Sequence, residues 1–353
     1  MKREMEWIEA LHRGERLSVE QLAGLIEGRT PEMAAQLFER ARSVSQARFG
    51  NRVFTRGLIE ISSFCKNNCR YCGIRRGNAN AQRYRLSDEE ILCCCDIGER
   101  LGYKTFVLQG GEDAFFTDQR LVALIREIKR RHPDCALTLS LGERSRASYQ
   151  ALYDAGADRY LLRHEAADPE LYGALHPAEM QWENRVRCLY DLKEIGYQVG
   201  AGFMVGAPGQ TSRHLAQDLD FLCRLKPQMV GIGPFVPHHD TEYRNQSAGS
   251  VELTLFLLGL IRLLLPDVLL PATTALGTVC ADGRERGILA GANVVMPNLS
   301  PQEVRAKYAL YDNKLSTGAE DAGRRDELDR RIRAIGYVLT AERGDAPGFE
   351  ARP

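Results

Sequence analysis

The sequence has no excess of either charge. Its 353 residues include 47 lysines and arginines and 47 aspartates and glutamates, so its formal net charge is zero. A chain without a basic field does not attract nucleic acid or an anionic membrane through its overall charge. We therefore expect neither nucleic acid nor a membrane as a partner.

The sequence also lacks a long uninterrupted apolar segment. Residues 1–17 contain no apolar stretch of the kind that forms a signal peptide. The most apolar run, residues 253–272, contains Arg262, Pro266 and Asp267 and is too short before them to span a bilayer. We expect a cytoplasmic protein in which this run forms a buried helix followed by a strand.

The first fifty residues are predicted to be helical. Ser18 and Gln21 have capping-box spacing, and Thr30 with Pro31 is typical of a helix start. From residue 53 onward, apolar segments of strand length alternate with amphipathic segments such as residues 87–102, 117–131 and 211–225. The expected strands are residues 53–62, 104–111, 136–143, 158–165, 198–206, 229–237, 269–276 and 292–299.

This alternation predicts an α/β fold. Eight βα units over roughly 250 residues are the usual size of a (β/α)8 TIM barrel, and a doubly wound open sheet is the alternative. We predict an N-terminal helical extension at residues 1–51, the barrel at 52–300 and a short C-terminal extension at 301–353. The last ten residues are expected to fray. Polar and glycine-rich residues crowd the carboxyl ends of the expected strands, where active sites of such barrels lie.

Ten cysteines in a large intracellular chain do not indicate a disulfide framework, and three of them form a motif. In "FCKNNCRYCGIRRGN", residues 64–78, Cys65, Cys69 and Cys72 directly follow the first expected strand. Structural zinc sites and ferredoxin-type clusters take four ligands. Three thiolates on a four-iron cluster would leave one iron open, and an open coordination position is typical of a catalytic metal site.

This loop, with the aromatic Tyr71 before its last cysteine, resembles the signature of the radical S-adenosylmethionine (SAM) superfamily. The resemblance implies one 4Fe–4S cluster on the three cysteines and SAM bound to the open iron. It further implies reductive cleavage of SAM to a 5′-deoxyadenosyl radical, chemistry that the cofactors carry and the protein positions. The cofactor contacts implied by the resemblance are Tyr71, Gln109, Gly110, Gly111, Glu165, Arg185 and Met204.

Longer phrases, from about residue 50 to 315, resemble the HydE family of FeFe-hydrogenase maturases. They include "RYLLRHEAADPELYGALHP", "GAGFMVGAPGQT", "MVGIGPFVPHHDT" and "GANVVMPNLSP". The implied substrate is a small iron complex with carbon monoxide, cyanide and cysteine, used in H-cluster assembly. The implied partners are the maturases HydG and HydF, contacted transiently, and an electron donor such as ferredoxin or flavodoxin.

Several further residues are expected to meet this substrate, although none is assigned a catalytic role. Arg159 and Arg163 lie on the same side of one strand, and we expect them to hold an anionic complex if that side is the lumen. The expected substrate contacts are Arg159, Arg163, Thr273, Thr274, Met296, Tyr308 and Tyr311.

The sequence departs from part of this family in one respect. Some HydE members hold a second cluster on C-terminal cysteines, but here no cysteine follows Cys280, which excludes such a cluster at that place. Cys93, Cys94 and Cys95 do not replace it, because successive helical residues point about 100° apart; we expect packed or solvated thiols.

Three alternatives remain open. Methylornithine synthase shares the expected barrel and is the nearest alternative. Biotin synthase also shares it but needs cysteines deep in the barrel, which the inner strands 138–143 and 200–206 lack. A non-catalytic iron–sulfur carrier is the alternative of another class, and the SAM-like residues around the barrel rim oppose it.

Overall fold

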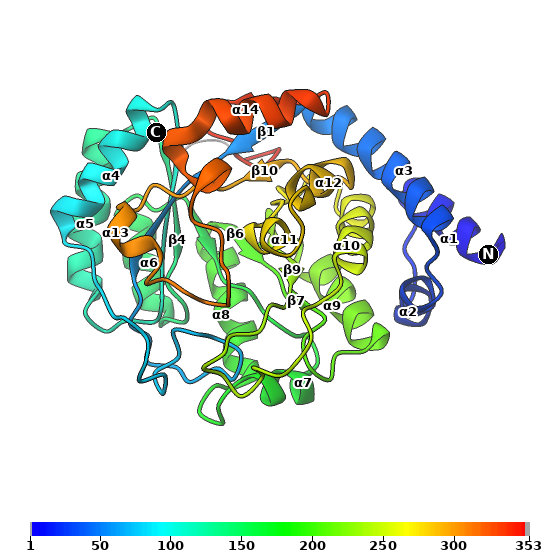
Figure 1. Ribbon diagram of the computed structural model, residues 1–353, viewed down its shortest axis with the longest axis horizontal. Helices are drawn as coiled ribbons and strands as arrows, with labels where there is room; N and C mark the ends of the chain where they lie inside the picture. The colour runs from blue at the N-terminus through cyan, green and yellow to red at the C-terminus, as the bar shows by residue number, and fades with distance from the viewer. Residues whose placement is uncertain (1, 350–353) are drawn as a thin grey trace.

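A ring of parallel strands surrounded by helices forms the centre of the molecule in the computed structural model, which describes residues 2–349 (Figure 1). The main sheet has the order β2–β3–β4–β5–β6–β8, all parallel. The strands are β1 (Arg52–Thr55), β2 (Gly57–Ser62), β3 (Thr105–Gly110), β4 (Ala136–Ser140), β5 (Arg159–Leu161), β6 (Gln198–Ala201), β7 (Met204–Val205), β8 (Met229–Val230), β9 (Gly233–Pro234), β10 (Val294–Val295) and β11 (Val338–Thr340).

The sheet closes on itself through short bridges. Met229 pairs with Leu269, Pro271 with Val294, and Leu58 with Asn298, each in the parallel sense. Backbone hydrogen bonds continue the ring, from Val230 N to Leu269 O at 3.0 Å and from Leu58 N to Pro297 O at 2.9 Å. Within residues 2–349, eight parallel chain segments therefore enclose one core, and the predicted (β/α)8 barrel is confirmed.

Several strands are shorter than the sequence indicates. The expected strand 53–62 divides into β1, which pairs with β10 and β11, and β2, which pairs with β3. The expected strand 269–276 makes bridges only at Leu269 and Pro271, and helix α11 (Thr274–Val279) begins within it. Pro271 has no N–H to give to a ladder, which helps to explain the interruption.

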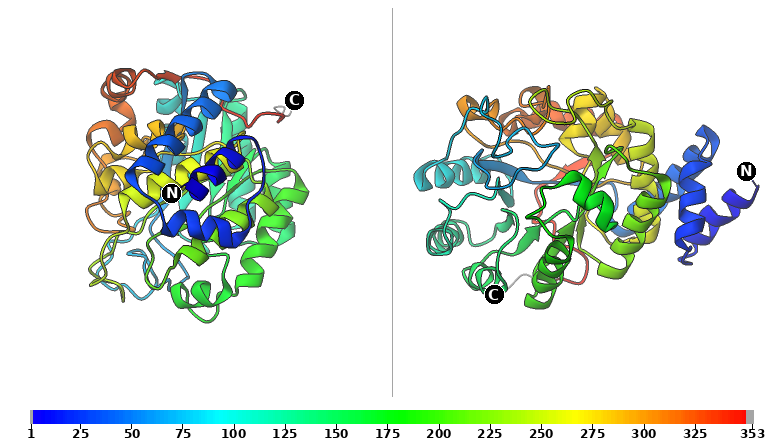
Figure 2. Two further views of the ribbon diagram at one scale, coloured as in Figure 1. Left: turned by 90° about the vertical axis from the view of Figure 1, so that its right-hand side faces the viewer. Right: turned by 90° about the horizontal axis from the view of Figure 1, so that it is seen from below.

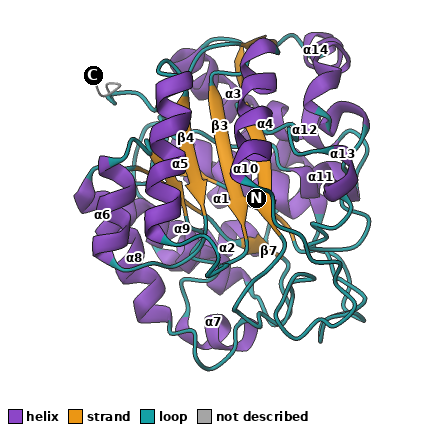
Figure 3. Cartoon of the chain, turned by 90° about the vertical axis from the view of Figure 1, so that its left-hand side faces the viewer, coloured by secondary structure: helices purple, strands orange, loops and turns teal. Residues whose placement is uncertain are grey.

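Helices cover the outer face of the ring, as α4, α5 and α6 do beside β3 and β4 in Figure 3. The helices are α1 (Lys2–His12), α2 (Val19–Glu27), α3 (Pro31–Phe49), α4 (Asp88–Arg100), α5 (Asp118–Arg131), α6 (Arg146–Asp154), α7 (Pro169–Leu175), α8 (Trp182–Ile195), α9 (Ser212–Leu225), α10 (Val251–Leu264), α11, α12 (Gly283–Leu289), α13 (Gln302–Arg305) and α14 (Arg325–Ala334), with 3-10 turns at Gly318–Glu320 and Ala322–Arg324.

The predicted N-terminal helices are present and lie at one side of the barrel (Figure 2). The capping box of Ser18 and Gln21 forms, and Thr30 caps α3 with Pro31 at its first turn, both as predicted. These helices pack on α9 and α10. The division of the chain at residues 51 and 300 stays a prediction.

In the apolar run 253–272 the predicted buried helix is present as most of α10, but the predicted strand is reduced to isolated bridges at Leu269 and Pro271. Arg262 is fully buried. Its guanidinium donates to the carbonyls of Gly291, Pro266 and Val268 at 2.8 Å each, and these hydrogen bonds offset the cost of burying its charge. Among the described residues, no helix has the length and apolar character needed to cross a bilayer.

The C-terminal segment closes the end of the barrel at which the strands begin, opposite the cysteine loop. Strand β11 pairs with β1, and the chain then crosses the strand ends with Ala346 buried. Gln198 Nε2 donates to Asp345 Oδ1 at 2.7 Å, and Ala346 N donates to Gln198 Oε1 at 2.9 Å. The expected frayed tail is therefore wrong for residues 344–349, and residues 350–353 lie outside the described part.

Candidate active site

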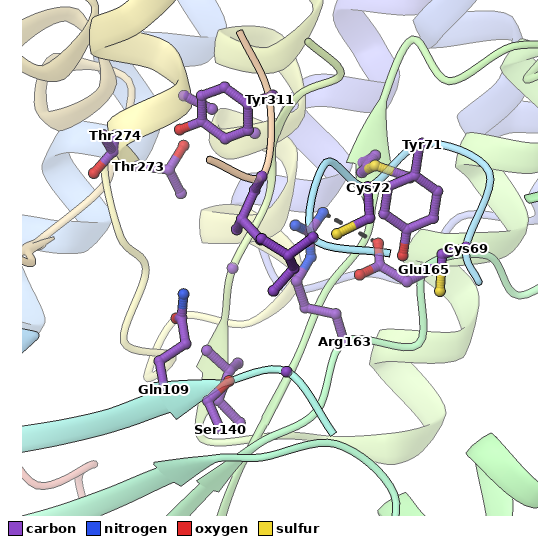
Figure 4. Close-up of a pocket in the computed structure, with 18 of the residues that line it drawn as sticks. Cys69, Tyr71, Cys72, Gln109, Ser140, Arg163, Glu165, Thr273, Thr274 and Tyr311 are labelled. Atoms are coloured by element: carbon purple, nitrogen blue, oxygen red, sulfur yellow. Dashed lines mark ion pairs between the residues drawn. The ribbon is translucent and has the colours of Figure 1, made fainter. Parts of the chain in front are cut away.

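A cavity of about 370 Å³ lies at the carboxyl ends of the barrel strands and holds all three motif cysteines in its wall. Volumes of this size suit small-molecule ligands. Figure 4 shows Cys69, Cys72 and Tyr71 with Glu165 on one side, Thr273, Thr274 and Tyr311 on the other, and Arg163 between them.

The cysteine loop is held by contacts from distant parts of the chain. Lys66 N donates to Glu112 O at 2.9 Å, and Gly73 N donates to Leu310 O at 2.8 Å. Arg83 donates to the carbonyls of Ile74 at 2.8 Å and Arg75 at 2.7 Å. These bonds fix the loop backbone and leave the thiols facing the cavity.

The three motif thiols do not converge on a single metal ion. In the described part of the chain, the only three His, Cys, Asp or Glu ligand atoms within 4.8 Å of one another belong to His238, His239 and Asp312. The cysteine sulfurs are spread more widely, as ligands to separate irons of a cluster would be.

The electrostatics of the loop also fit a cationic metal group. Burial raises the pKa of Cys72 to about 12, with the neighbouring Cys65 adding to the shift. Burial and the two other cysteines raise the pKa of Cys69 well above its ordinary value. Three thiolates at this place therefore need a positive metal group, and metal coordination deprotonates thiols outright.

Charged side chains next to the loop form a second group. Arg185 Nε pairs with Glu143 Oε1 at 2.6 Å, and Arg185 Nη1 donates to Arg163 O at 2.6 Å. Glu165 has φ of 65°, an uncommon conformation for a residue with a side chain and one that often marks a functional site. Arg163 Nη2 lies 3.3 Å from Glu165 Oε2, the ion pair dashed in Figure 4.

An aromatic pair supports the same wall. Tyr71 Oη lies 3.3 Å from His176 Nε2, and the two rings meet edge to face. Burial, together with the nearby Arg185 charge, lowers the pKa of His176 to about 3. His176 is therefore neutral near pH 7 and supports Tyr71 without adding a charge.

The structure brings all but one of the predicted cofactor and substrate residues into this cavity. The lining includes Tyr71, Gln109, Gly110, Gly111, Glu165, Arg185, Met204, Arg163, Thr273, Thr274, Met296, Tyr308 and Tyr311.

Arg159 is the exception, and its expected substrate contact is wrong. Its side chain is fully buried at the end of the barrel at which the strands begin, where Nη2 pairs with Asp345 Oδ1 at 2.7 Å and Nη1 donates to Thr105 Oγ1 at 3.1 Å. Arg163 lies four residues further along, at the cavity. The two arginines belong to the same chain segment, but they lie at opposite ends of the barrel.

The cavity wall also contains a buried ion pair that was not predicted from the sequence. Lys314 Nζ lies 2.5 Å from Glu60 Oε1, and Asn298 Nδ2 donates to Glu60 Oε2 at 2.9 Å. Both charged residues line the cavity. The signal for Glu60 was present in the sequence as a single acid within an apolar strand, directly before the cysteine loop.

The remaining consecutive cysteines take no part in the site. Cys93 is exposed on α4, whereas Cys94 and Cys95 are buried in its packed face. They are solvated and packed thiols, respectively.

Fold and site together define the class of protein. Residues 59–222 match the family described as the Radical SAM superfamily. The chain is a radical SAM enzyme, and membership of that superfamily implies an iron–sulfur cluster and SAM as its cofactors.

Comparison with individual proteins identifies a smaller family within this superfamily. The FeFe hydrogenase maturase subunit HydE of Thermotoga maritima is 47% identical over 285 residues, which is 81% of each chain. The chain belongs to the HydE family.

Two solved structures share the barrel. Methylornithine synthase (PylB) is 28% identical with a TM-score of 0.84, over 94% of this chain and 97% of that one. HydG, a maturase of the FeFe hydrogenase, is 20% identical with a TM-score of 0.81, over 96% and 76%. The likeness to HydG concerns the fold alone.

Proposed function

We propose that the protein cleaves SAM reductively and acts on a cysteine-ligated iron complex with carbonyl and cyanide ligands during H-cluster assembly. Family membership supports the maturation role. The observation that carries the substrate class is Arg163, whose Nη2 lies 3.3 Å from Glu165 Oε2 while its Nε is buried with no hydrogen-bond partner among the described residues. A half-buried guanidinium at the cavity wall that keeps one donor unused favours an anionic ligand.

The cofactors would occupy the cysteine side of the cavity. One 4Fe–4S cluster would be held by Cys65, Cys69 and Cys72, and with SAM it would supply a 5′-deoxyadenosyl radical. The proposed SAM contacts are Tyr71, Gln109, Gly110, Gly111, Glu165, Arg185 and Met204. Arg185 is braced by Glu143, so its guanidinium is fixed in place at the cavity wall.

The substrate would occupy the opposite side. Thr273 Oγ1 is buried without a hydrogen-bond partner among the described residues, so it is free to bind a ligand. Thr274 Oγ1 already donates to Glu320 at 3.0 Å and is a positioning residue on this reading. Arg163 would take the anionic part of the complex, and the remaining proposed contacts are Met296, Tyr308 and Tyr311.

The partners follow from the same role. We propose transient exchange with HydG and HydF and an electron donor such as ferredoxin or flavodoxin. All ten cysteines are free, which suits a reducing compartment such as the cytoplasm.

Product analysis tests the proposal. Reduced, reconstituted enzyme would receive SAM and the cysteine-bound iron complex, with mass spectrometry and electron paramagnetic resonance following adenosylated product. We expect that product from the complex, and none when Arg163→Met replaces the wild type.

A second candidate is methylornithine synthase activity, which the likeness to PylB favours. The same assay with lysine decides between the two. Conversion of lysine to methylornithine, with plain 5′-deoxyadenosine as the coproduct, would replace the maturase proposal.

A further inference from the structure

His238, His239 and Asp312 form a cluster of metal-ligand side chains outside the cavity. The two histidines lie on the loop after β9, and Asp312 lies on the segment after α13. One ligand atom from each lies within 4.8 Å of the others, and within residues 2–349 no other group of three His, Cys, Asp or Glu residues has this arrangement.

The backbone around the cluster is already fixed. Asp312 N donates to Pro237 O, and His239 N donates to Asp312 Oδ2, each at 3.0 Å. His239 Nδ1 lies 2.6 Å from Asp312 Oδ1. The two segments are therefore joined before any ion binds, which lowers the cost of ordering the ligands.

A fourth oxygen donor stands beside them. Asp240 Oδ2 lies 3.4 Å from His239 Nε2, and Asp240 Oδ1 accepts from Asn80 Nδ2 at 2.9 Å. Asn80 belongs to the segment that follows the cysteine motif. The cluster thus connects three parts of the chain.

We propose that His238, His239 and Asp312 bind one divalent first-row transition-metal ion of the Zn²⁺ type. Two imidazoles and a carboxylate suit such ions, whereas Mg²⁺ and Ca²⁺ prefer oxygen ligands alone. Asp240 or water completes the coordination. This site is separate from the cysteine cluster and does not depend on the proposed substrate.

The existing hydrogen bonds of the two imidazoles determine which nitrogen an ion can reach. Asp240 N donates to His238 Nδ1 at 3.1 Å, so an ion binds Nε2 of His238 or displaces this bond. His239 Nδ1 lies 2.6 Å from Asp312 Oδ1, so an ion replaces that hydrogen bond or binds Nε2 of the His239 side chain, which is 69% exposed.

The ion would fix one wall of the cavity. Asp312 stands between Tyr311 and Lys314, which both line the cavity, and Leu310 O accepts the hydrogen bond from Gly73 N. A Cβ on Gly73 would come within 2.6 Å of His238 Nε2, so His238 packs directly against the cysteine loop. Metal binding would tie the segment over the cavity to the loop beside the cysteines.

The test uses the full chain with its cluster reconstituted anaerobically. Zn²⁺ binding is measured by calorimetry and by metal analysis after dialysis, with the cluster absorbance recorded on each sample. We expect one Zn²⁺ per chain, and an affinity at least about tenfold weaker in His239→Ala and in Asp312→Asn. His12→Ala, which removes an exposed imidazole on α1, is the matched control and should bind like the wild type.

Thermal unfolding gives a second readout, since an ion that binds only the folded chain raises the melting temperature. The rise should appear in the wild type and in His12→Ala and should be absent from both ligand variants. The proposal is overturned if the wild type binds no Zn²⁺ at about 100 μM. It is equally overturned if both ligand variants bind as tightly as the wild type, or if Zn²⁺ uptake only accompanies loss of the cluster absorbance.

Discussion

At the scale of single residues, the cavity contains two ion pairs of different character. Glu60 is fully buried, and its two oxygens are satisfied by Lys314 and Asn298. The pair of Arg163 and Glu165 is looser, at 3.3 Å, and leaves Nε of Arg163 without a hydrogen-bond partner among the described residues. The first pair therefore braces the wall, whereas the second is placed to meet a ligand.

Lys314→Met should destabilise the protein by about 3–5 kcal/mol, because it leaves the Glu60 carboxylate buried without its partner. Adding Glu60→Gln should recover most of that loss. Anaerobic urea unfolding of the two variants and the wild type measures both effects. A single variant as stable as the wild type would show that the pair does not brace the wall.

Glu165→Ala should weaken SAM binding by about 1.5–3 kcal/mol, or roughly ten- to hundredfold, because one charged hydrogen bond is lost. The iron content should not change, since Glu165 is not a cysteine-loop residue. Equilibrium binding of SAM to reconstituted enzyme measures the effect, with the exposed Glu183→Ala as the control. Equal SAM affinity in both variants would remove Glu165 from the cofactor site.

The sequence predicted the position of a residue well only where the neighbouring residues in the chain identify that position. The cysteines are recognised from their own spacing, and they do line the cavity. The predicted substrate contact of Arg159 was wrong because strand periodicity gives the face on which a residue lies but not its position along the barrel axis. A rise of about 3.3 Å per residue separates Arg159 from Arg163 by about 13 Å, enough to reach the other end of the barrel.

At the scale of elements, the cysteine loop depends on a close approach at Gly111. A Cβ added there would lie 2.2 Å from Phe64 O and 2.7 Å from Cys65 Cβ. The turn after β3 thus packs directly on the start of the loop. The sequence could not show this contact, because its two sides are almost fifty residues apart.

Gly111→Ala should displace the loop and lower the iron bound per chain after reconstitution. The matched control is Gly173→Ala in α7, where an added Cβ meets nothing within 4 Å. Iron and sulfide analysis of both variants, prepared side by side, measures the effect. Full iron content in Gly111→Ala would mean that the loop tolerates a shift at this point.

At the scale of the whole molecule, the end of the barrel at which the strands begin is closed by the protein's own C-terminal segment. Composition suggested a frayed tail, since residues 344–353 are rich in glycine, proline and charge. The order of residues 344–349 comes from partners on the strand ends, Arg159 and Gln198, which no local pattern could reveal. The eight βα units, in contrast, repeat along the chain, so the barrel itself was predictable.

Asp345 should make this closure dependent on pH. Burial opposes its ionisation, but Arg159, Gln198 and Arg343 outweigh burial and lower its pKa to about 2. The charged form therefore stabilises the fold by about 2 kcal/mol above pH 4, and this contribution is lost as the pH falls from about 4 toward 2.

Asp345→Asn should accordingly lower the free energy of unfolding by at least about 2 kcal/mol at pH 7, with a smaller difference from the wild type near pH 3. Urea unfolding of both proteins at the two pH values measures it. A difference that stays constant with pH would show that the Asp345 charge is not its source.

The central claim is that three cysteines hold a four-iron cluster whose open iron binds SAM. Electron paramagnetic resonance of the reduced, reconstituted enzyme, recorded with and without SAM, tests it most directly. We expect a cluster signal that changes on SAM addition in the wild type and is absent when Cys65, Cys69 and Cys72 are all replaced by alanine. A signal that SAM leaves unchanged, or that survives the triple replacement, would contradict it.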